Sequence, residues 1–561
     1  MRGVIDHLRR GMENLGDATL SPPSPPCDGD GDGDGDGDDR RRRRSIICSA
    51  RIAAQNYRQQ REDGVNLVCK RLLSSTTTPI DTICFQPDGV SWENASLTDD
   101  AFALSHHSNC NNEREYKSSG ETFNSSSGET VRFKQQYINH NIPCVIRGLD
   151  KSHFSFVTSQ WRSAERQSID DGSKIMQVEK VHQINTEWFR QFVGNDTMVP
   201  VRYTEICDDN ELRNDGDEDG LDDDGRAQEC KTKQMSLDEW ISTCQNHQTR
   251  PLRDNFSSSD PKKNDTEPRI EWYLKDWHLL QFLANQDSYS ATSPSPPLPL
   301  YTTPNIFERD ILNRFLERCG SDRDEGGDYK FVYWGPAGSR TSLHSDVLHS
   351  FSWSYNVVGM KKWIFYVPPS FYNHTLRNNR EEMKRYRFEV IQHAGETIFV
   401  PCTWKHEVVN LVETLSINHN WITSANVDQA WICLQTEISA IEEEIQAWGV
   451  IPTGDFEARE NMLRGCIGLD CTMFTLMVML EIVELLPHIH IVDGGHHSDD
   501  ELWDCAYSMF RLGDVLVDVL RKEDLVERMA ARVGSDSLAR EVKSIGNDVI
   551  QIISKLNEYP D

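Results

Sequence analysis

The stretch from residue 330 to 424 constrains the fold most, because it consists of short runs rich in tryptophan, phenylalanine, tyrosine and valine. The turn sequences GPAG, GMK, PPS and HAGE separate these runs. Short β runs at this spacing, with turns between them, are typical of a β-sandwich or a β-barrel. We therefore expect residues 330–424 to fold as a sandwich or barrel of short strands.

From residue 425 onward the pattern changes to helical periodicity. Apolar side chains recur at spacings of three and four residues, which places them on one helical face: Trp431, Leu434, Ile438, Ile441, Ile445 and Trp448. Gly449 and Pro452 should end this helix. Further helices are expected at about 458–486, 499–521 and 536–557. The apolar stripe could pack on the chain's own core or form the seam of a homodimer, and the pattern leaves both open.

Upstream of the β region the sequence carries several helix and strand signals. We expect a strand after Pro143 and a helix at 185–193 that Asn185 caps. An amphipathic helix is expected at 305–319, where apolar side chains are four residues apart. The very acidic stretch at about 208–225 is expected to be a solvated loop inserted between ordered elements.

Residues 1–128 are predicted to be mostly disordered. They contain SPPSPP, a Gly-Asp repeat, the arginine run Arg40–Arg44 and Ser/Asn-rich segments, and these compositions do not build a core. The arginine run could be a nuclear import signal or the charge-balancing part of a tail. We therefore predict that the chain has three parts. These are the mostly disordered region 1–128, a folded domain at 129–424 with its catalytic core at about 270–424, and a helical region at 425–561.

The charge balance limits the classes of partner. The 561 residues carry a net charge of -30, so broad contact with a phosphate backbone is not expected, and a basic protein or peptide fits better. The most apolar run, Cys471–Leu480, is too short to span a bilayer, and no membrane association is expected. The 15 cysteines form no C-x-x-C pair, which favours a reducing compartment, cytoplasmic or nuclear.

The sequence HSD at 344–346 is the first candidate for chemistry. Residues i and i+2 of a strand face the same side, so His344 and Asp346 can point together into the interior. Two imidazoles and one carboxylate with open positions are typical of non-haem Fe(II) oxygenases. His406, delivered by a later strand and turn, can supply the second imidazole. Thr341 and Lys361 supply a hydroxyl and a cation that suit the distal carboxylate of 2-oxoglutarate.

Together these segments resemble the JmjC domain, the double-stranded β-helix core of 2-oxoglutarate oxygenases. WGPAGSRTSLHSD, SWSYNVVGMKKWIFYVPP, GETIFVPCTWKHEVVNL and SINHNW occur in the family order, and the resemblance covers about residues 131–424. It implies an α+β fold, with a cupin-like jelly-roll core, flanking helices and a helical C-terminal region. The segments YLKDWHL (273–279), GPAGSRTSLHSD and FSWSYNVVGMKKW resemble those of the JmjC domain-containing protein 4 subfamily.

The resemblance also implies roles for individual residues. The iron ligands would be His344, Asp346 and His406. The residues around 2-oxoglutarate would be Lys361, Thr341, Tyr273, Asn418 and Asn420. Related hydroxylases often carry asparagine ten residues after the first iron ligand, where this chain has Ser354, and Ser354 could still hydrogen-bond the co-substrate.

The implied activity is oxidation of a protein side chain with Fe(II), 2-oxoglutarate and O2, with ascorbate in support. Members of the subfamily are described as lysyl hydroxylases of the translation termination factor, which makes that lysine the leading expectation. A plant member is described as a histone arginine demethylase, so a histone tail is the alternative substrate, with arginine or lysine demethylation as the reaction. An inactive JmjC binding module and a non-oxygenase cupin are the less favoured readings, because the ligand set is complete.

Overall fold

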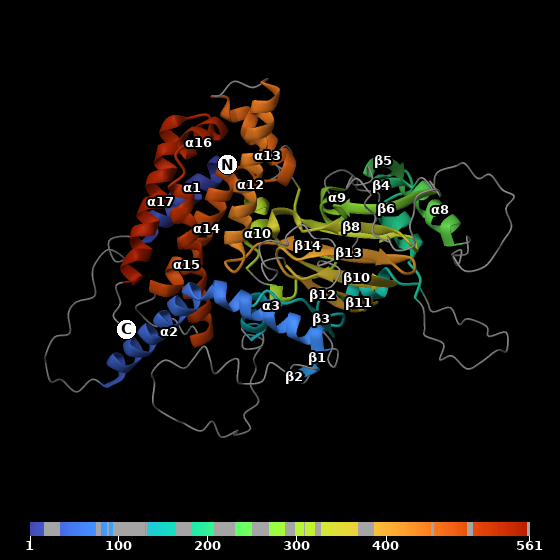
Figure 1. The fold of residues 1–561 in the computed structure, drawn as a ribbon, viewed down its shortest axis with the longest axis horizontal. Coiled ribbons are helices and arrows are strands. Elements are labelled where there is room, and N and C mark those ends of the chain that lie inside the picture. Colours follow the sequence, from blue (N-terminus) through green and yellow to red (C-terminus); the bar gives the residue numbers. More distant parts are fainter. Residues whose placement is uncertain are drawn as a thin grey trace.

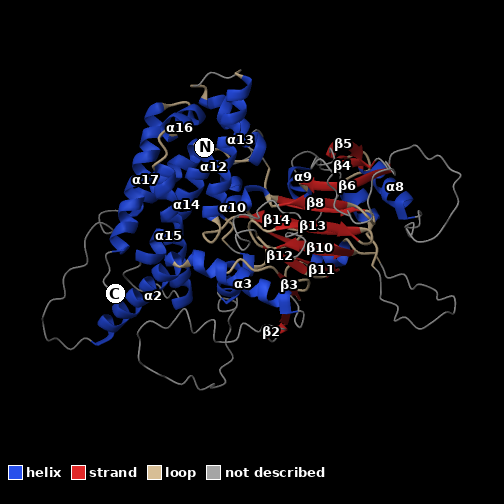
Figure 2. Cartoon of the chain, in the orientation of Figure 1, coloured by secondary structure: helices blue, strands red, loops and turns tan. Residues whose placement is uncertain are grey.

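The structure is a computed structural model in which helices gather on one side and β-sheets on the other (Figure 1). Colouring by secondary structure makes the division between the two halves plain (Figure 2). The structure describes these residues: 1–15, 34–74, 80–86, 89–93, 130, 132–163, 182–206, 230–248, 269–286, 298–307, 309–319, 327–368, 386–449, 454–490 and 498–557.

The strands of residues 330–421 alternate between two sheets. The larger sheet takes β7 (Lys330–Gly335), β9 (Phe351–Val358), β12 (Thr397–Val400) and β14 (Thr414–Trp421). The smaller sheet has the order β11-β10-β13-β8 and consists of β8 (Arg340–His344), β10 (Met360–Tyr366), β11 (Arg387–His393) and β13 (Lys405–Asn410). Strands that alternate between two facing sheets form a double-stranded β-helix, so the predicted α+β class with a jelly-roll core is confirmed.

Further strands extend both edges of the larger sheet to ten strands. Next to β7 lie, in order, β6 (Arg269–Trp277), β4 (Met198–Ile206) and β5 (Cys230–Ser236). Next to β12 lie β3 (Cys144–Arg147), β1 (Asp81–Gln86) and β2 (Gly89–Glu93). Because β6 borders β7, it adds its own side chains to the wall of the jelly roll.

The two faces of the larger sheet differ in polarity. Along β9, Trp353 and Tyr355 point to an apolar core, where Phe154 stacks on Tyr355 with 3.9 Å between ring centroids. The alternate residues of β9 and β14 are serine and asparagine. Ser416 of β14 accepts a hydrogen bond from Lys361 of β10, so the polar face is directed at the smaller sheet. A polar space between the two sheets is therefore available for a site.

Helices and helical turns from the segment before β7 cover the outer, apolar face of the larger sheet. They include the π-helical turn η2 (Lys134–Ile138), α6 (Ser155–Gln160), α7 (Thr186–Phe192), α8 (Leu237–Gln248), α9 (Leu279–Gln286) and the 3-10 turn η3 (Asn305–Phe307). The predicted cap of α7 is confirmed, since the Asn185 side chain accepts a hydrogen bond from the Trp188 amide. The predicted strand after Pro143 is β3, which Gly148 ends at a φ of 86°.

The C-terminal region is helical, as expected. It contains α12 (Val427–Trp448), α13 (Phe456–Ile467), α14 (Cys471–His490), α15 (Asp499–Leu520), α16 (Leu525–Val533) and α17 (Asp536–Asn557). The apolar stripe of α12 is buried in the chain's own helical core, except for Trp448, which is 73% exposed. Cys471–Ile489 of α14 is long and apolar enough to cross a membrane, yet 83% of it is buried inside the structure, which is the environment of a core helix.

The N-terminal region departs from the disorder expected for residues 1–128. Within it the structure has α1 (Arg2–Leu15), α2 (Asp34–Gln55), α3 (Tyr57–Ser74) and the strands β1 and β2. Val4, Ile5 and Leu8 of α1 are buried in the helical core, and β1 pairs in parallel with β3. For these segments the prediction of disorder was wrong, because burial against distant partners stabilises them.

Helix α3 ties the two halves of the molecule together. In Figure 1 it runs from the helical half toward β1 at the sheet edge. Arg61 of α3 donates to both carboxylate oxygens of Asp428 on α12, each at 3.1 Å, and Arg511 of α15 donates to the same carboxylate at 2.6 Å. The charges of two guanidinium groups thus neutralise one buried carboxylate. Removing any one of the three side chains would leave a buried charge without its full compensation and would destabilise this junction.

Two helix predictions had wrong boundaries. The helix expected at 305–319 begins only as α10 (Ile311–Cys319), because Arg309 has a φ of 59° and Asp310 caps the helix at the Asn313 amide. The helix expected at 458–486 is divided at Gly468, which has a φ of 79°. The predicted acidic insert at 208–225 lies outside the described residues.

Gly359→Ala is expected to lower the free energy of unfolding by about 1–3 kcal/mol, because its backbone lies in the left-handed region at a φ of 91°. An added Cβ would also lie 2.2 Å from the Glu413 carbonyl oxygen. Thermal unfolding measures the effect. Gly465→Ala in α13 is the matched control, since a Cβ there meets nothing within 4 Å, and its Tm should stay the same or rise. Equal Tm values for wild type and Gly359→Ala would contradict the strained turn.

Candidate metal and cofactor site

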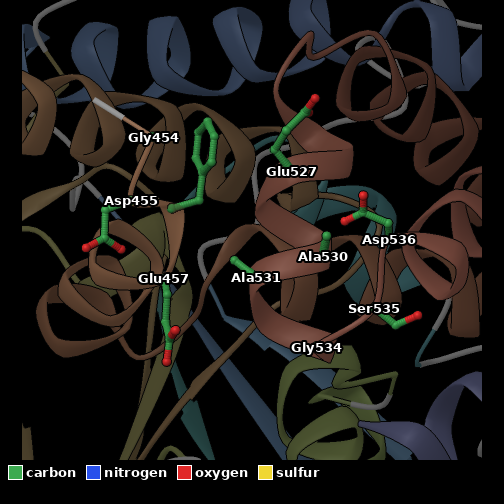
Figure 3. A pocket seen from close by; sticks show the side chains of 10 residues that line it. Gly454, Asp455, Glu457, Glu527, Ala530, Ala531, Gly534, Ser535 and Asp536 are labelled. Carbon is green, nitrogen blue, oxygen red and sulfur yellow. The ribbon is translucent and has the colours of Figure 1, made fainter. Parts of the chain in front are cut away.

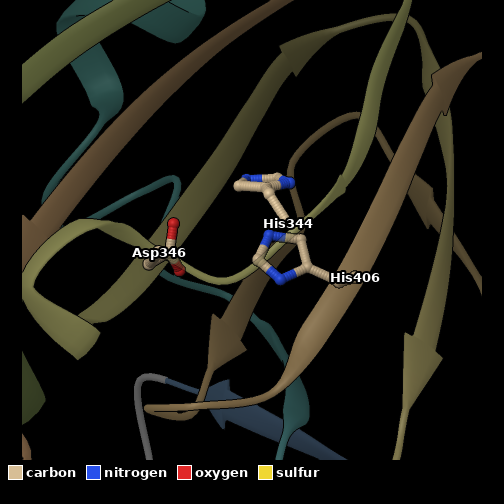
Figure 4. Close-up of side chains that lie close together, drawn as sticks. All are labelled: His344, Asp346 and His406. Atoms are coloured by element: carbon tan, nitrogen blue, oxygen red, sulfur yellow. The ribbon is translucent and has the colours of Figure 1, made fainter. Parts of the chain in front are cut away.

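His344, Asp346 and His406 come together at one end of the space between the sheets (Figure 4). His344 is the last residue of β8 and pairs directly with His406 of β13. Their ring centroids are 4.3 Å apart, and one ligand atom from each of the three side chains lies within 4.8 Å of the others. The structure therefore brings the three residues singled out in the sequence into one cluster that could hold a metal ion.

The hydrogen bonds of the two imidazoles define which nitrogen is available. His344 Nδ1 lies 2.8 Å from the Ser342 carbonyl oxygen, and His406 Nδ1 lies 3.1 Å from the Trp404 carbonyl oxygen. A carbonyl oxygen only accepts, so each Nδ1 must carry the proton. In the neutral rings Nε2 then keeps its lone pair, which is the form that ligates a metal.

Burial and neighbouring positive charge keep His344 in this neutral form. Burial is the largest cause, and together with His406 and Lys275 it lowers the pKa of His344 to about 3. Near neutral pH the ring therefore has no proton to lose before it binds a cation.

Asp346 is placed by the chain just beyond β8. Its backbone stays extended, with φ −60° and ψ 145°, so the strand alternation continues and turns its side chain to the side of His344. The Ser352 hydroxyl donates to Asp346 Oδ2 at 2.7 Å, which orients the carboxylate. The 3-10 turn η4 (Val347–His349) follows, with Leu348 at a φ of 58°.

Lys361 of β10 lies deeper between the sheets. Its side chain is 1% exposed, and Nζ donates to Ser416 Oγ at 2.7 Å. Among the described residues no carboxylate lies within 4 Å of this ammonium group. Burial, and to a lesser extent the charge of Lys275, lowers the pKa of Lys361 to about 7. A buried cation without an anionic partner fits a ligand that brings a carboxylate.

A β-bulge explains how Thr341 can face the same space as His344. Residues three apart in a regular strand point to opposite faces. Between His344 and Thr341, β8 uses three steps where β13 uses two, from His406 to Val408. The extra residue in β8 turns one of the two side chains over. Thr341 is half-buried, in keeping with a place at the wall of the space.

The remaining predicted residues lie on the larger sheet. Tyr273 of β6 is buried, and burial raises the pKa of its phenol. Asn418 donates to Ser416 Oγ at 3.0 Å, so it shares an acceptor with Lys361. Asn420 donates to Ser350 Oγ at 3.0 Å, two positions further along β14. The Ser354 hydroxyl is buried and has no hydrogen-bond partner among the described residues, so it is available to a ligand.

Sequence reasoning missed Ser416 and Ser352, which hold Lys361 and Asp346. The signal was present, because each lies two residues before a predicted site residue on the same strand, Asn418 and Ser354 respectively. Extending the alternation by one step would have found both. His419, in contrast, points away from the pocket as its position predicts, with its Nε2 2.6 Å from the Tyr301 hydroxyl oxygen.

A separate hollow of about 470 Å³ lies in the helical half, between the start of α13 and the turn that joins α16 to α17 (Figure 3). It is lined by Gly454, Asp455, Phe456, Glu457, Glu527, Ala530, Ala531, Gly534, Ser535 and Asp536. This lining contains no histidine, cysteine or lysine, and none of the predicted site residues. The hollow therefore makes no contribution to the metal cluster.

The donor set fits the metal and co-substrate expected from the sequence. Two imidazole nitrogens and one carboxylate suit Fe(II) and leave coordination positions for a chelating ligand. The buried Lys361 ammonium and the orphaned Ser354 hydroxyl suit a polar, dianionic molecule in the same space. The site could thus hold iron at the mouth and a 2-oxo dicarboxylate extending inward.

Comparison with known proteins gives the same picture. The model of the cupin-like domain family matches residues 130–426. The 2-oxoglutarate and iron-dependent oxygenase JMJD4 of Gallus gallus is 37% identical over 36% of this chain and 48% of its own length. JMJD4 of Mus musculus is 28% identical over 70% of this chain and 82% of its own length. The arginine-specific demethylase JMJ20 of Arabidopsis thaliana is 39% identical over 33% of this chain and 43% of its own length.

The chain spans about half the length of the first curated relatives it matches, which are 48%, 50% and 50% covered. The family model, however, matches more than half of this chain. The resemblance to JmjC oxygenases that the motifs indicated is therefore confirmed, and the chain belongs to the cupin-like domain family.

Proposed function

We propose that this protein is an Fe(II)- and 2-oxoglutarate-dependent oxygenase that hydroxylates a protein side chain. One observation carries the proposal: a cluster of two imidazoles and a carboxylate lies in the same space as a buried lysine without an anionic partner among the described residues. A metal cluster or a buried lysine by itself would fit several classes of protein. Their combination in a jelly roll matches a chelated metal with a dicarboxylate co-substrate. The names of the similar oxygenases support it.

In this proposal each residue has a defined task. His344, Asp346 and His406 would hold the iron, with Ser352 and the two backbone carbonyls fixing the ligands. When bound, the iron and its co-substrates supply the oxidation of an aliphatic C–H bond. The protein orients the reactants and excludes water around them.

Lys361 would pair with the distal carboxylate of 2-oxoglutarate. Ser416 accepts from Lys361 and from Asn418, so three side chains present their polar atoms in one place. Thr341 and Tyr273 would add hydroxyl donors from β8 and β6. A charged pair with neutral donors around it fixes both the depth and the direction of a carboxylate.

The leading substrate is a lysine of the translation termination factor, on the strength of the subfamily resemblance of YLKDWHL and GPAGSRTSLHSD. The second candidate is a methylated arginine or lysine of a histone tail, which the similar arginine-specific demethylase favours. Both are basic substrates, and the chain's net charge of -30 suits either. The two reactions use one site and differ in the C–H bond presented to it.

The test incubates the purified full chain with Fe(II), 2-oxoglutarate and ascorbate, together with termination-factor or methylated histone peptides. Gain of one oxygen on the lysine peptide without loss of a methyl group supports hydroxylation. Loss of a methyl group with release of formaldehyde supports demethylation instead. Asp346→Ala is the matched inactive control. Absence of succinate formation with every peptide, and without peptide, would overturn the oxygenase proposal.

The affinity for 2-oxoglutarate should fall as the pH rises above about 7, because burial lowers the pKa of Lys361 to about 7. Only the ammonium form pairs with a carboxylate, so binding takes up a proton at higher pH. Each further pH unit should then weaken binding about tenfold. Calorimetry at about pH 6.5, 7.5 and 8.5, in buffers of different ionisation enthalpy, measures the affinity and the proton uptake. A flat profile without proton uptake would contradict this role of Lys361.

A further inference from the structure

Strand β6 carries a second β-bulge at the wall of the site, at Lys275 and Asp276. From Leu274 to Trp277 the strand takes three steps, while its partner β7 takes two, from Trp334 to Val332. Asp276 has a φ of 58°, which is the left-handed conformation that residues other than glycine rarely adopt. Bulges of this kind redirect side chains and occur frequently beside active sites.

Two contacts hold the bulge in this strained form. The Tyr333 hydroxyl donates to Asp276 Oδ1 at 2.8 Å, and Arg202 of β4 forms an ion pair with Asp276. Tyr333 lies on β7, on the same face as the polar side chains of the site. These contacts compensate for the backbone strain at Asp276. Because they hold the bulge in place, they also fix the direction in which the preceding side chain, Lys275, points.

Lys275 points its ammonium group toward the site. Its Nζ lies 5.5 Å from the centre of the Tyr333 ring, and Nζ of Lys361 lies 5.9 Å from the centre of the same ring. Its charge also lowers the pKa of Lys361. The half-buried Lys275 and the deep cation Lys361 therefore lie beside the same ring, at the wall of the site.

We propose that Lys275 is a second co-substrate-binding cation, which contacts 2-oxoglutarate between the metal cluster and Lys361. This inference rests on the proposed function. An anion is the ligand that this position fits, because a second ammonium group beside Lys361 would repel the cationic target lysine or arginine. A dianion that extends inward to Lys361 passes the wall at which Lys275 lies, and both ammonium groups attract it.

The test measures binding without turnover. Full-length protein is loaded with Mn(II), and the Kd of 2-oxoglutarate is measured by calorimetry for wild type, Lys275→Met and Lys275→Arg. Lys275→Met should raise the Kd about tenfold or more, the loss expected for one charged contact, while Lys275→Arg stays much closer to wild type. The Kd of Mn(II) itself should not weaken in either variant.

Lys233→Met is the matched control. Lys233 of β5 makes the same kind of contact, 5.9 Å from the Trp272 ring centre, but it pairs with Glu239 at an exposed position. Its 2-oxoglutarate Kd should equal that of wild type. Tm values within a few degrees of wild type show that the variants are folded.

One result would overturn the inference while leaving the oxygenase proposal intact: Lys275→Met binds 2-oxoglutarate as tightly as wild type. If the KM of the peptide rises at the same time, that result would assign Lys275 to the protein substrate. If wild type itself fails to bind 2-oxoglutarate, the proposed function fails as well, and the two failures are thereby distinguished.

Discussion

Replacing His344 with alanine is expected to abolish 2-oxoglutarate turnover and to weaken Fe(II) binding by about 100-fold or more. Loss of a residue that only supports a ligand already costs about 10- to 100-fold in metal affinity, so loss of a ligand should cost at least as much. His344 faces His406 directly and is one of three donors in the cluster. Succinate formation measures turnover, and metal analysis of the purified protein measures binding.

Heat stability gives a second measurement of the same change. A metal that binds only the folded state raises the Tm, so wild type should gain stability with added Fe(II) or Mn(II) while His344→Ala should not. His393→Ala is the matched control, because His393 is exposed at the end of β11 and away from the cluster. Equal 2-oxoglutarate consumption by wild type and His344→Ala would rule out an iron site at this cluster.

Replacing Lys361 with methionine should separate binding from stability. The affinity for 2-oxoglutarate should fall by about 100-fold, since the distal carboxylate of the co-substrate loses its buried cationic partner. The metal-free, ligand-free protein should become more stable at about pH 6, by a few kcal/mol, because the buried charge carries a penalty that methionine lacks. Ligand loss together with stabilisation is a result that a merely structural lysine would not give.

The direction of the pH effect follows from the pKa of Lys361, which is lowered from 10.5 to about 7 in the folded protein by burial first and then by Lys275. Below pH 7 the amine is protonated in both folded and unfolded states, so the full penalty acts. Between the two values the unfolded chain binds more protons, and the stability of wild type rises with pH. The advantage of Lys361→Met should therefore be largest at low pH and disappear above about pH 10.5.

Lys362→Met provides the control on the same strand. Lys362 lies on the other face of β10, where it pairs with Glu389 at 3.6 Å, and is half-exposed. Its replacement should change neither the 2-oxoglutarate Kd nor the pH profile of stability. Thermal unfolding and calorimetry of the three proteins measure both quantities. A Tm for Lys361→Met below that of wild type at about pH 6 would contradict a buried charge that opposes folding.

Much of the β region was predictable because its signals are local. The alternation of residues 330–424 depends only on neighbours along the chain, and it is confirmed by β7 to β14. In the metal cluster, His344 and Asp346 were predicted from their local spacing of two residues. His406 is distant in the sequence, and it was identified because its motif follows theirs in the order typical of the family. The helix at 185–193 was predicted for the same reason, since the Asn185 cap acts within one turn.

The N-terminal region shows where local signals fail. Its composition is that of a disordered tail, yet Val4 and Leu8 are buried against the helical half and β1 joins the larger sheet beside β3. The stabilising contacts come from residues hundreds of positions away, such as the Asp428 that pairs with Arg61. The amino-acid composition of a segment carries no information about the distant residues against which its short apolar face packs, so it cannot show that this face is stabilised.

The sequence by itself determined the types of element and the identity of the candidate ligands, because strand alternation and ligand chemistry are properties of nearby residues. Only the tertiary structure decided which faces meet. The extra residue in β8 brings Thr341 to the same face as His344. The bulge in β6 turns Lys275 toward the Tyr333 ring, which Lys361 also approaches. A bulge exists only relative to a paired strand, and a buried charge only relative to what surrounds it, so neither can be recognised before the chain is folded.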